Sequence, residues 1–199
     1  MAMAATMALG ARYDTTSDGS WTNAAVVWAN GYPAPGDVAR ISHDVTVDSP
    51  GVVANKAAVG YSSAGDLTVN SGGTLTFANN VNVGDAYAGT LFLDGGQMGV
   101  TGGALNIGNG ATGLLTVNNG GYLNLAQNLS IAKLGAGTVT LNDGLIIGRN
   151  LNIGNTGGSG LGTVDLLGGS MILTNSALSD AGRLDIRTAG DVLNIENDA

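Results

Sequence analysis

Cysteine is absent from this sequence of 199 residues, and proline occurs only three times. Without cysteine the chain has no disulfide framework and no thiolate metal site. Charged residues make up 11% of the chain and hydrophobic residues 44%, a composition too apolar for an intrinsically disordered protein. No apolar run approaches the roughly 18 residues that a membrane-spanning helix needs. The length is that of one domain with a substantial core.

Basic residues are scarce and scattered. Seven Lys and Arg residues stand against fifteen Asp and Glu residues, which gives a net charge of −8, and the basic residues are spread from Arg12 to Arg187. A nucleic-acid partner needs clustered basic side chains, so the sequence predicts none. Glutamate occurs once, at Glu196, whereas Asp, Asn, Gly and Thr are frequent. Because these residues favour turns and strands, we expect almost no helix.

Glycine is abundant, with 34 residues, and it marks an internal repeat. Four similar blocks open at Gly65, Gly89, Gly113 and Gly137, and the interval between their openings is constant (89 − 65 = 113 − 89 = 137 − 113 = 24). Two later blocks open at Gly162 and Gly182, after intervals that differ from it (162 − 137 = 25 and 182 − 162 = 20). Self-similarity at a fixed period indicates a repeat architecture, in which each block is one structural unit.

Within each block, hydrophobic and polar residues alternate with the period of a β-strand. The first strands carry inward pairs that we place in one column, namely Leu67/Val69, Leu91/Leu93, Leu115/Val117, Val139/Leu141, Val164/Leu166 and Leu184/Ile186. Second strands follow at Leu75/Phe77 and Leu123/Leu125, and third strands at Val81/Val83, Leu105/Ile107, Leu129/Ile131 and Leu151/Ile153. Since two inward residues bury too little surface alone, the blocks are expected to stack.

Two architectures fit a block of three short strands: a parallel β-helix with one block per coil, or antiparallel hairpins in a sandwich or propeller. We favour an all-β, single-stranded parallel β-helix (a β-solenoid), because the columns recur in the same order and the corners are too irregular for two-residue hairpins. Residues 36–199 then form about seven coils. Asn70, Asp94, Asn118 and Asn142 recur at the interval of the blocks and are expected to form a side-chain hydrogen-bond ladder.

Both ends depart from the repeat. Residues 1–35 are expected to form an apolar segment and an atypical N-terminal cap, in which Trp21 and Trp28 cover the first coil. Residues 1–10 carry no charged side chain and are either a remnant of a secretion signal or a mature segment that packs on a partner. The C-terminal residues keep a strand pattern without a capping helix, so the last coil would present an edge to other chains.

A resemblance becomes visible after the tryptophan-rich opening. The pattern P-x-P-G-D-x-A-x-I at residues 33–41 precedes V-T-V-D and glycine-rich coils of the G-x-L-x-V-x-x-G-G-x-L kind. Residues 20–199 are therefore similar to secreted bacterial parallel β-helix proteins, with repeats that resemble autotransporter passengers. The resemblance implies an extracellular or cell-surface location. It also implies a role as an adhesin, matrix component or scaffold, and some such proteins act on polysaccharides.

Three motifs suggest chemistry, and the fold explains each. G-x-G-x-x-G at residues 108–113 precedes a strand, whereas a dinucleotide site needs a helix there. Residues 157–162 approach a calcium-binding repeat, but Gly162 stands where the aspartate is needed. His43 is the single histidine, and the sequence supplies no nucleophile beside it. We therefore expect no enzymatic activity, no cofactor and no metal site.

The function that we expect is structural: end-to-end assembly into a filament or matrix, with the last coil of one copy against the first coil of the next. The residues expected at this contact are Met3, Met7, Leu9, Leu184, Ile186, Leu193 and Ile195. One alternative is a cell-surface adhesin or carbohydrate-binding module for surface polysaccharide, with Tyr61 and Tyr87 as a sugar platform. A third is a polysaccharide-acting enzyme.

Overall fold

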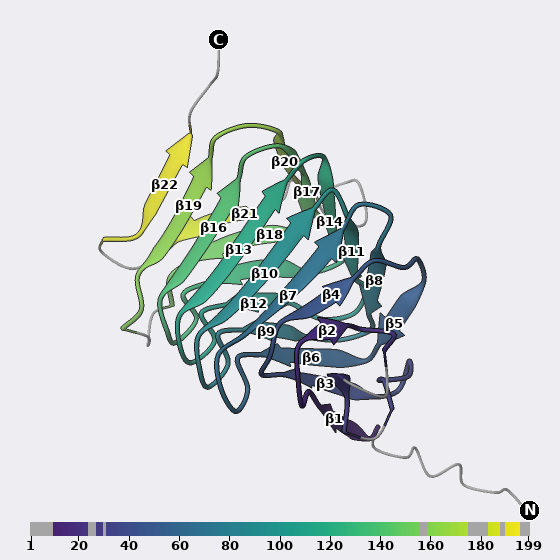
Figure 1. The fold of residues 1–199 in the computed structure, drawn as a ribbon. Coiled ribbons are helices and arrows are strands. Elements are labelled where there is room, and N and C mark those ends of the chain that lie inside the picture. The colour runs from purple at the N-terminus through teal and green to yellow at the C-terminus, as the bar shows by residue number, and fades with distance from the viewer. Residues whose placement is uncertain are drawn as a thin grey trace, which may run out of the picture.

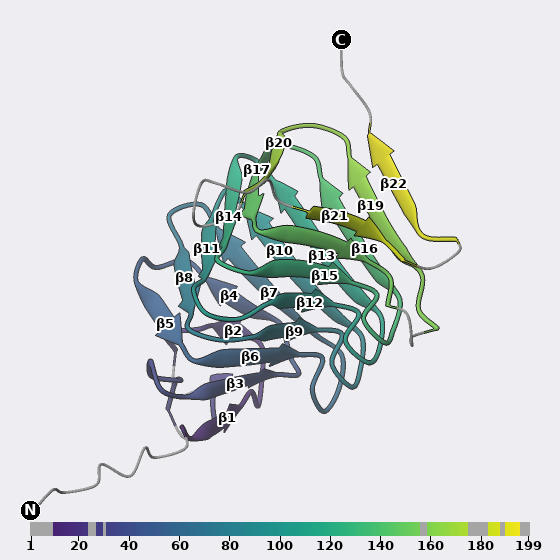
Figure 2. The same ribbon diagram turned by 180° about the vertical axis from the view of Figure 1, so that it is seen from behind.

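The protein is a parallel β-solenoid, as the repeat predicts. A computed structural model describes residues 10–23, 27–29, 31–155, 159–174, 183–187 and 190–195. The elements of these residues are 22 strands, which wind as one coil with three strands in each complete turn (Figures 1 and 2). In the described ranges, no helix is long and apolar enough to cross a membrane.

Three sheets form the walls of the solenoid. Sheet I contains β1 (Arg12–Asp14), β3 (Val38–Ile41), β6 (Lys56–Val59), β9 (Val81–Val83), β12 (Leu105–Ile107), β15 (Asn128–Ile131), β18 (Asn150–Ile153) and β21 (Arg183–Ile186). Sheet II contains β2 (Gly19–Ser20), β4 (Val45–Val47), β7 (Gly65–Asn70), β10 (Gly89–Asp94), β13 (Gly113–Asn118), β16 (Gly137–Leu141), β19 (Gly162–Leu166) and β22 (Val192–Ile195). Sheet III contains β5 (Val52–Ala54), β8 (Thr74–Phe77), β11 (Gln97–Val100), β14 (Gly121–Leu125), β17 (Gly144–Gly148) and β20 (Ser170–Leu173).

The strand register confirms the repeat that the glycines mark. Leu91 pairs with Leu67 in the turn before it and with Leu115 in the turn after it. Every named strand pair is parallel, so residues of one kind lie above one another along the solenoid. The stacked side chains fill a continuous core in which Leu67, Leu91 and Leu115 are fully buried. Polar residues between them face outward, as the alternation predicts.

The chain completes six three-strand turns, from β3–β4–β5 to β18–β19–β20. At each end a partial turn adds one strand to sheet I and one to sheet II: β1 and β2 at the start, β21 and β22 at the finish. The expectation of about seven coils is therefore slightly high. It assumed that every coil has the length of the repeated block, whereas the paired residues Leu151 and Leu184 lie 33 positions apart (184 − 151 = 33).

One column was assigned wrongly from the sequence. Leu184 and Ile186 do not continue the column of Val164 and Leu166 in sheet II. They pair with Leu151 and Ile153 in sheet I. The residues that follow Val164 and Leu166 in sheet II are Leu193 and Ile195. The cause is that inward pairs of every sheet share the same apolar-x-apolar pattern, so the pattern alone does not identify the sheet.

The polar ladder forms only in part. Asn142 Nδ2 donates to Asn118 Oδ1 at 3.1 Å, which is one step of the expected ladder. Asn70 Nδ2 donates instead to Asp48 Oδ1 at 2.6 Å, and Asp94 accepts from the neighbouring Asn119. Further steps occur in sheet I and at its corners, where the pairs are Asn82 with Asn106, Asp85 with Asn109, Asn55 with Asn79 and Asn128 with Asn150. These bonds tie successive turns together along the outside.

The N-terminal turn is covered by the aromatic segment, as expected. Trp21 and Trp28 are buried and meet edge to face, with ring centroids 4.9 Å apart. The same segment runs along the outer edge of β1: Ala29 N donates to Asp14 O at 3.1 Å, and Thr16 N donates to Val27 O at 2.8 Å. The bridge between Thr15 and Trp28 is antiparallel. The first turn is therefore capped, and part of its strand edge is already paired.

Candidate functional site: the C-terminal end of the solenoid

The opposite end of the solenoid is open in the described part of the chain. Sheets I, II and III end on β21, β22 and β20, and each of these strands pairs with a named strand on one side only. Figure 2 shows β20, β21 and β22 together at the end far from β1. Unpaired strand edges present rows of N–H and C=O groups, which can pair with another chain.

Core side chains of this last turn are exposed. Leu184 and Ile186 are 45% and 51% accessible, although their register partners Leu151 and Ile153 are 2% and 0% accessible. Ile195, on β22, is 71% accessible. The register directs these side chains toward the solenoid interior, and within the described residues no further strand pairs above them. Their exposure therefore does not come from an outward orientation.

We call this surface the C-terminal end face. On β20 the inward residues Met171 and Leu173 are half-buried, and on β22 so is Leu193. The outward residues Ile172 and Val192 are also exposed hydrophobic side chains. The C-terminal end face is made up of Met171, Ile172, Leu173, Leu184, Ile186, Val192, Leu193 and Ile195. Such a concentration of exposed apolar side chains is typical of an interaction surface.

Charged side chains border this face on sheet I. Arg183 Nε donates to Asp185 Oδ1 at 2.6 Å, and Arg187 Nη2 donates to Asp185 Oδ2 at 2.8 Å. The hydrogen bond from Arg187 has the larger effect, and together with that from Arg183 it holds the pKa of Asp185 below its usual value. Arg187 also donates to Asn152 Oδ1 at 3.0 Å. The charges therefore lie on the outer wall of β21 and leave its inward side apolar.

The structure brings together four of the seven residues expected at the assembly contact, namely Leu184, Ile186, Leu193 and Ile195. The other three, Met3, Met7 and Leu9, lie outside the described residues. Sequence reasoning missed β20, which supplies three members of the end face. A signal was present in the apolar run of Met171, Ile172 and Leu173 in the fifth block, but only the register shows that β20 ends its sheet.

His43 lies in a hydrogen-bonded corner without a catalytic arrangement. Its Nδ1 is 3.1 Å from the Thr15 hydroxyl, which also accepts a hydrogen bond from Ser42 N at 2.8 Å. The Ser42 hydroxyl lies 2.8 Å from that of Ser62, so no serine hydroxyl is paired with the His43 ring in the described residues. Thr15 is buried. These hydrogen bonds hold the first turns together.

Three aspartates stack beside this corner, at equivalent positions of successive turns. Asp44 N donates to Asp18 Oδ1 at 2.9 Å, and Asp66 occupies the next position. Desolvation raises the pKa of Asp44 above its ordinary value, and the negative charges of Asp66 and Asp18 act in the same direction. Within the described ranges no group of three His, Cys, Asp or Glu side chains could hold a metal ion.

The two tyrosines of the predicted sugar platform lie on neighbouring corner loops between sheets I and II. Tyr87 N donates to Gly60 O at 2.8 Å, so its loop contacts the loop that carries Tyr61. The Arg40 guanidinium stands 4.2 Å from the centroid of the Tyr61 ring. The ring pairs of the described residues join Trp21 to Trp28 and Phe77, and neither includes a tyrosine. Tyr61 and Tyr87 are thus close along the backbone without stacked rings.

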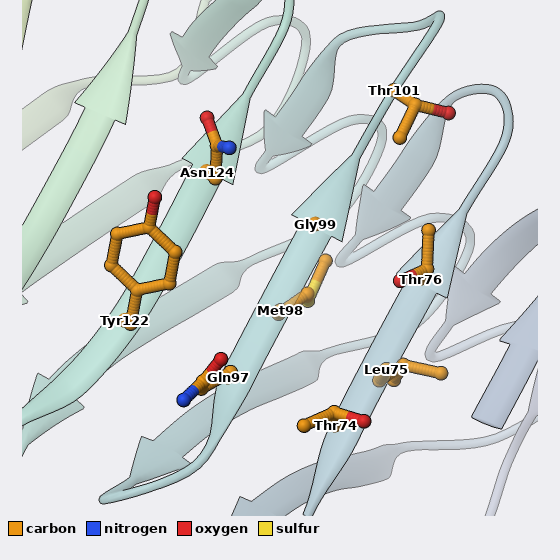
Figure 3. Close-up of a pocket in the computed structure, with 9 residues that line it drawn as sticks. All are labelled: Thr74, Leu75, Thr76, Gln97, Met98, Gly99, Thr101, Tyr122 and Asn124. Carbon is orange, nitrogen blue, oxygen red and sulfur yellow. The ribbon is translucent and has the colours of Figure 1, made fainter. Parts of the chain in front are cut away.

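A shallow polar hollow of about 250 Å³ lies on the outer face of sheet III. Gly99 lies between Thr76 and Asn124 in the register, and its missing side chain leaves a gap in the row. Figure 3 shows the Tyr122 ring beside this gap, with Gln97 next to it on β11. A flat tyrosine face bordered by amide and hydroxyl groups suits a sugar ring, because the sugar can stack on the tyrosine while the polar groups fix its hydroxyls.

Comparison with protein-family models, with curated proteins and with solved structures found no match.

Proposed function

We propose that this chain is a structural module that self-associates end to end through its C-terminal end face. The observation that carries the proposal is the exposure of Leu184 and Ile186, side chains whose register partners one turn earlier are completely or almost completely buried. Covering them with another protein surface removes apolar area from water, which is the main driving force of association. It also pairs the free edges of three strands.

The difference between the two ends supports this choice of surface. A filament that continues the parallel ladder from one copy to the next needs a free strand edge at both ends. Among the described residues, Ala29 and Val27 already pair with the outer edge of the first turn. Association through the C-terminal end face therefore requires no rearrangement, whereas a head-to-tail ladder requires the cap to move.

The variant Ile186→Asp tests this function. A carboxylate at the centre of an apolar contact must be desolvated when the contact forms, so we expect the dissociation constant of the assembly to rise by at least about tenfold. Sedimentation velocity over a range of concentrations measures it. The control is Leu134→Asp, since Leu134 is also exposed, at 53%, but lies on a mid-chain corner. If wild type, Ile186→Asp and Leu134→Asp all associate with the same dissociation constant, the C-terminal end face is not the surface through which the chain assembles.

Several finer features remain predictions within this proposal. Growth into a filament or matrix, an extracellular or cell-surface location and a secreted bacterial origin depend on the resemblance to autotransporter-like β-helix proteins. A role of Met3, Met7 and Leu9 belongs to a head-to-tail filament, is separate from association through the C-terminal end face, and depends on the apolar character of residues 1–10. We propose no enzymatic activity, because the polar corner around His43 is occupied by structural hydrogen bonds.

A second candidate function is binding of a surface polysaccharide at the hollow of sheet III. The supporting observation is the half-buried Tyr122 ring beside the gap at Gly99, with Gln97 and Asn124 around it (Figure 3). On a glycan array, Tyr122→Ala is expected to lose most of any wild-type signal, because stacking of a sugar on the aromatic ring supplies much of such affinity. Tyr61→Ala and Tyr87→Ala serve as controls. If the signal is lost in Tyr61→Ala and Tyr87→Ala but kept in Tyr122→Ala, the polysaccharide binds at the corner loops instead.

A further inference from the structure

The C-terminal end face has an internal symmetry that limits how a partner fits. Its three strands are consecutive along the coil: β20 in sheet III, then β21 in sheet I, then β22 in sheet II. Because three strands make one turn, the chain rises on average by a third of one turn from each strand to the next, which places β21 between the other two in height. The end of the coil is therefore a spiral step with β21 at its centre (Figure 2).

In a regular triangular coil, in which sheets II and III flank sheet I symmetrically, a two-fold axis that passes just beyond the centre of β21, perpendicular to the solenoid axis, maps this step onto a complementary copy of itself. The rotation reverses heights and exchanges the positions of sheets II and III. It places β21 against β21 of the second copy, β22 against β20, and β20 against β22. The vertical separation is the same in all three pairs, so when one pair reaches the usual spacing of about 4.8 Å, all three do. The rotation also reverses strand direction, which makes each pair antiparallel.

We infer that the partner of the C-terminal end face is a second copy of this chain, joined tail to tail about this two-fold axis into a closed dimer. The inference rests on the proposed function and specifies its geometry. An isologous contact of this kind uses one surface twice and so needs nothing from the capped N-terminal turn. It leaves no free strand edge at the joined ends.

The charges on β21 favour one register of the central pair. With Leu184 opposite Leu184 of the second copy, Arg183 lies opposite Asp185 on the outer wall, and the reverse pair forms by symmetry. The Arg183 side chain is largely exposed and has room to turn toward the second copy. A shift of the register instead places Asp185 opposite Asp185. Opposite charges directly across two strands stabilise an antiparallel pair, and like charges destabilise it.

The outward hydrophobic side chains agree with the same arrangement. Ile172 and Val192 are both exposed, on β20 and β22, which belong to different sheets of one chain. The two-fold axis brings β20 of one copy beside β22 of the other, so Ile172 and Val192 become neighbours on one continuous sheet. Contact between these two side chains would then remove part of their exposed apolar surface from water.

Disulfide capture tests the axis directly, since the chain contains no cysteine of its own. In the variant Leu184→Cys, the two thiols face each other across the two-fold axis. Directly opposed antiparallel residues have Cα atoms about 4.5–5.5 Å apart, within the range that a disulfide spans. We expect mild oxidation of the full chain to give a covalent dimer as the main product. Leu134→Cys, similarly exposed but on a corner two turns before β21, is expected to cross-link only at a background level.

Sedimentation velocity of the wild-type chain completes the experiment, and its outcomes separate the two proposals. A dimer that does not grow with concentration, together with the Leu184→Cys cross-link, supports the inference. An open series of larger species without that cross-link overturns the two-fold dimer and leaves end-to-end association standing. A monomer at all concentrations overturns both. Far-UV circular dichroism of Leu184→Cys, expected to match wild type, shows that the solenoid still folds.

Discussion

Gly89→Ala is expected to destabilise the protein by about 3 kcal/mol or more, the upper range for an overpacked core. Gly89 opens β10, and its backbone does not need a positive φ. A Cβ atom added there would lie 2.6 Å from Val59 O and 2.8 Å from Gly84 N. Both atoms belong to the backbone, so neither can turn aside as a side chain would. The turn that contains Gly89 must move away from the turn before it.

The same restriction recurs along the solenoid and explains the most regular feature of the sequence. At Gly65 an added Cβ would lie 2.9 Å from Ile41 O, and at Gly137 it would lie 2.7 Å from Ile107 O. In each case the carbonyl belongs to sheet I of the preceding turn. The constant period of the glycines therefore marks a corner where the backbone of one turn passes too close to that of the previous turn to leave room for a side chain.

Gly99→Ala is the matched control. Gly99 also lies in a strand, but the nearest atom to an added Cβ is Thr76 Oγ1, at 3.8 Å, which is ordinary contact. Because glycine weakens a strand interior by roughly 0.5–1 kcal/mol relative to alanine, this variant is expected to be unchanged or slightly more stable. Urea unfolding followed by circular dichroism measures both. A similar loss of stability in the two variants would contradict the close-approach explanation.

Much of the fold could be predicted because each turn of the solenoid has a recognisable pattern in the sequence. The alternation around Leu67, Leu91 and Leu115 identifies strands, and the constant interval identifies parallel stacking in register. Neither inference needs knowledge of loops or of contacts distant in the sequence. Because the strand pattern recurs in every block, irregular corners do not prevent the prediction of the fold. One column of strands is enough to fix the register of the turns that share the constant interval.

The prediction was wrong where the interval changed. The block at Gly182 follows Gly162 at a shorter interval than the earlier blocks, too short for one coil, yet its G-x-L-x-I opening matched theirs. In the structure Leu184 belongs to sheet I because the preceding coil is longer than the coils before it. A short apolar pair carries information about burial but none about which wall of the solenoid it occupies. The interval between successive blocks therefore indicated the position of Leu184 better than the apolar pattern did.

The candidate site was predictable only in part for a related reason. An uncapped strand pattern at residues 183–195 suggested an exposed edge, and Leu184 and Ile195 are indeed exposed there. The contribution of β20 depends on which strand ends sheet III, which only the register reveals. The sequence predicted a cap formed by Trp21 and Trp28, but it did not predict the antiparallel bridge between Thr15 and Trp28, because that bridge lies outside the repeat.

Trp21→Ala is expected to cost about 3–5 kcal/mol of unfolding free energy, the usual range for removing a large buried aromatic side chain. Trp21 is fully buried, and its ring lies 6.3 Å from that of Phe77, centroid to centroid. Ala54 pairs with Phe77 in the register, and its small side chain leaves room for this contact. The Trp21 Nε1 atom has no hydrogen-bond partner in the described residues, so the cost comes from lost packing.

The loss is expected to be local as well as large, because each turn of a solenoid contacts mainly its neighbours. The Trp28 side chain donates from Nε1 to the backbone oxygen of Trp21 at 2.8 Å. The substitution keeps this acceptor but removes the ring that packs against Trp28. Hydrogen exchange should therefore quicken first in β1 to β4, while β15 to β19 stay protected. Tyr32→Ala, an exposed aromatic of the same segment, is expected to change neither stability nor exchange appreciably. Uniform loss of protection along the coil would show that the cap stabilises the solenoid as a whole.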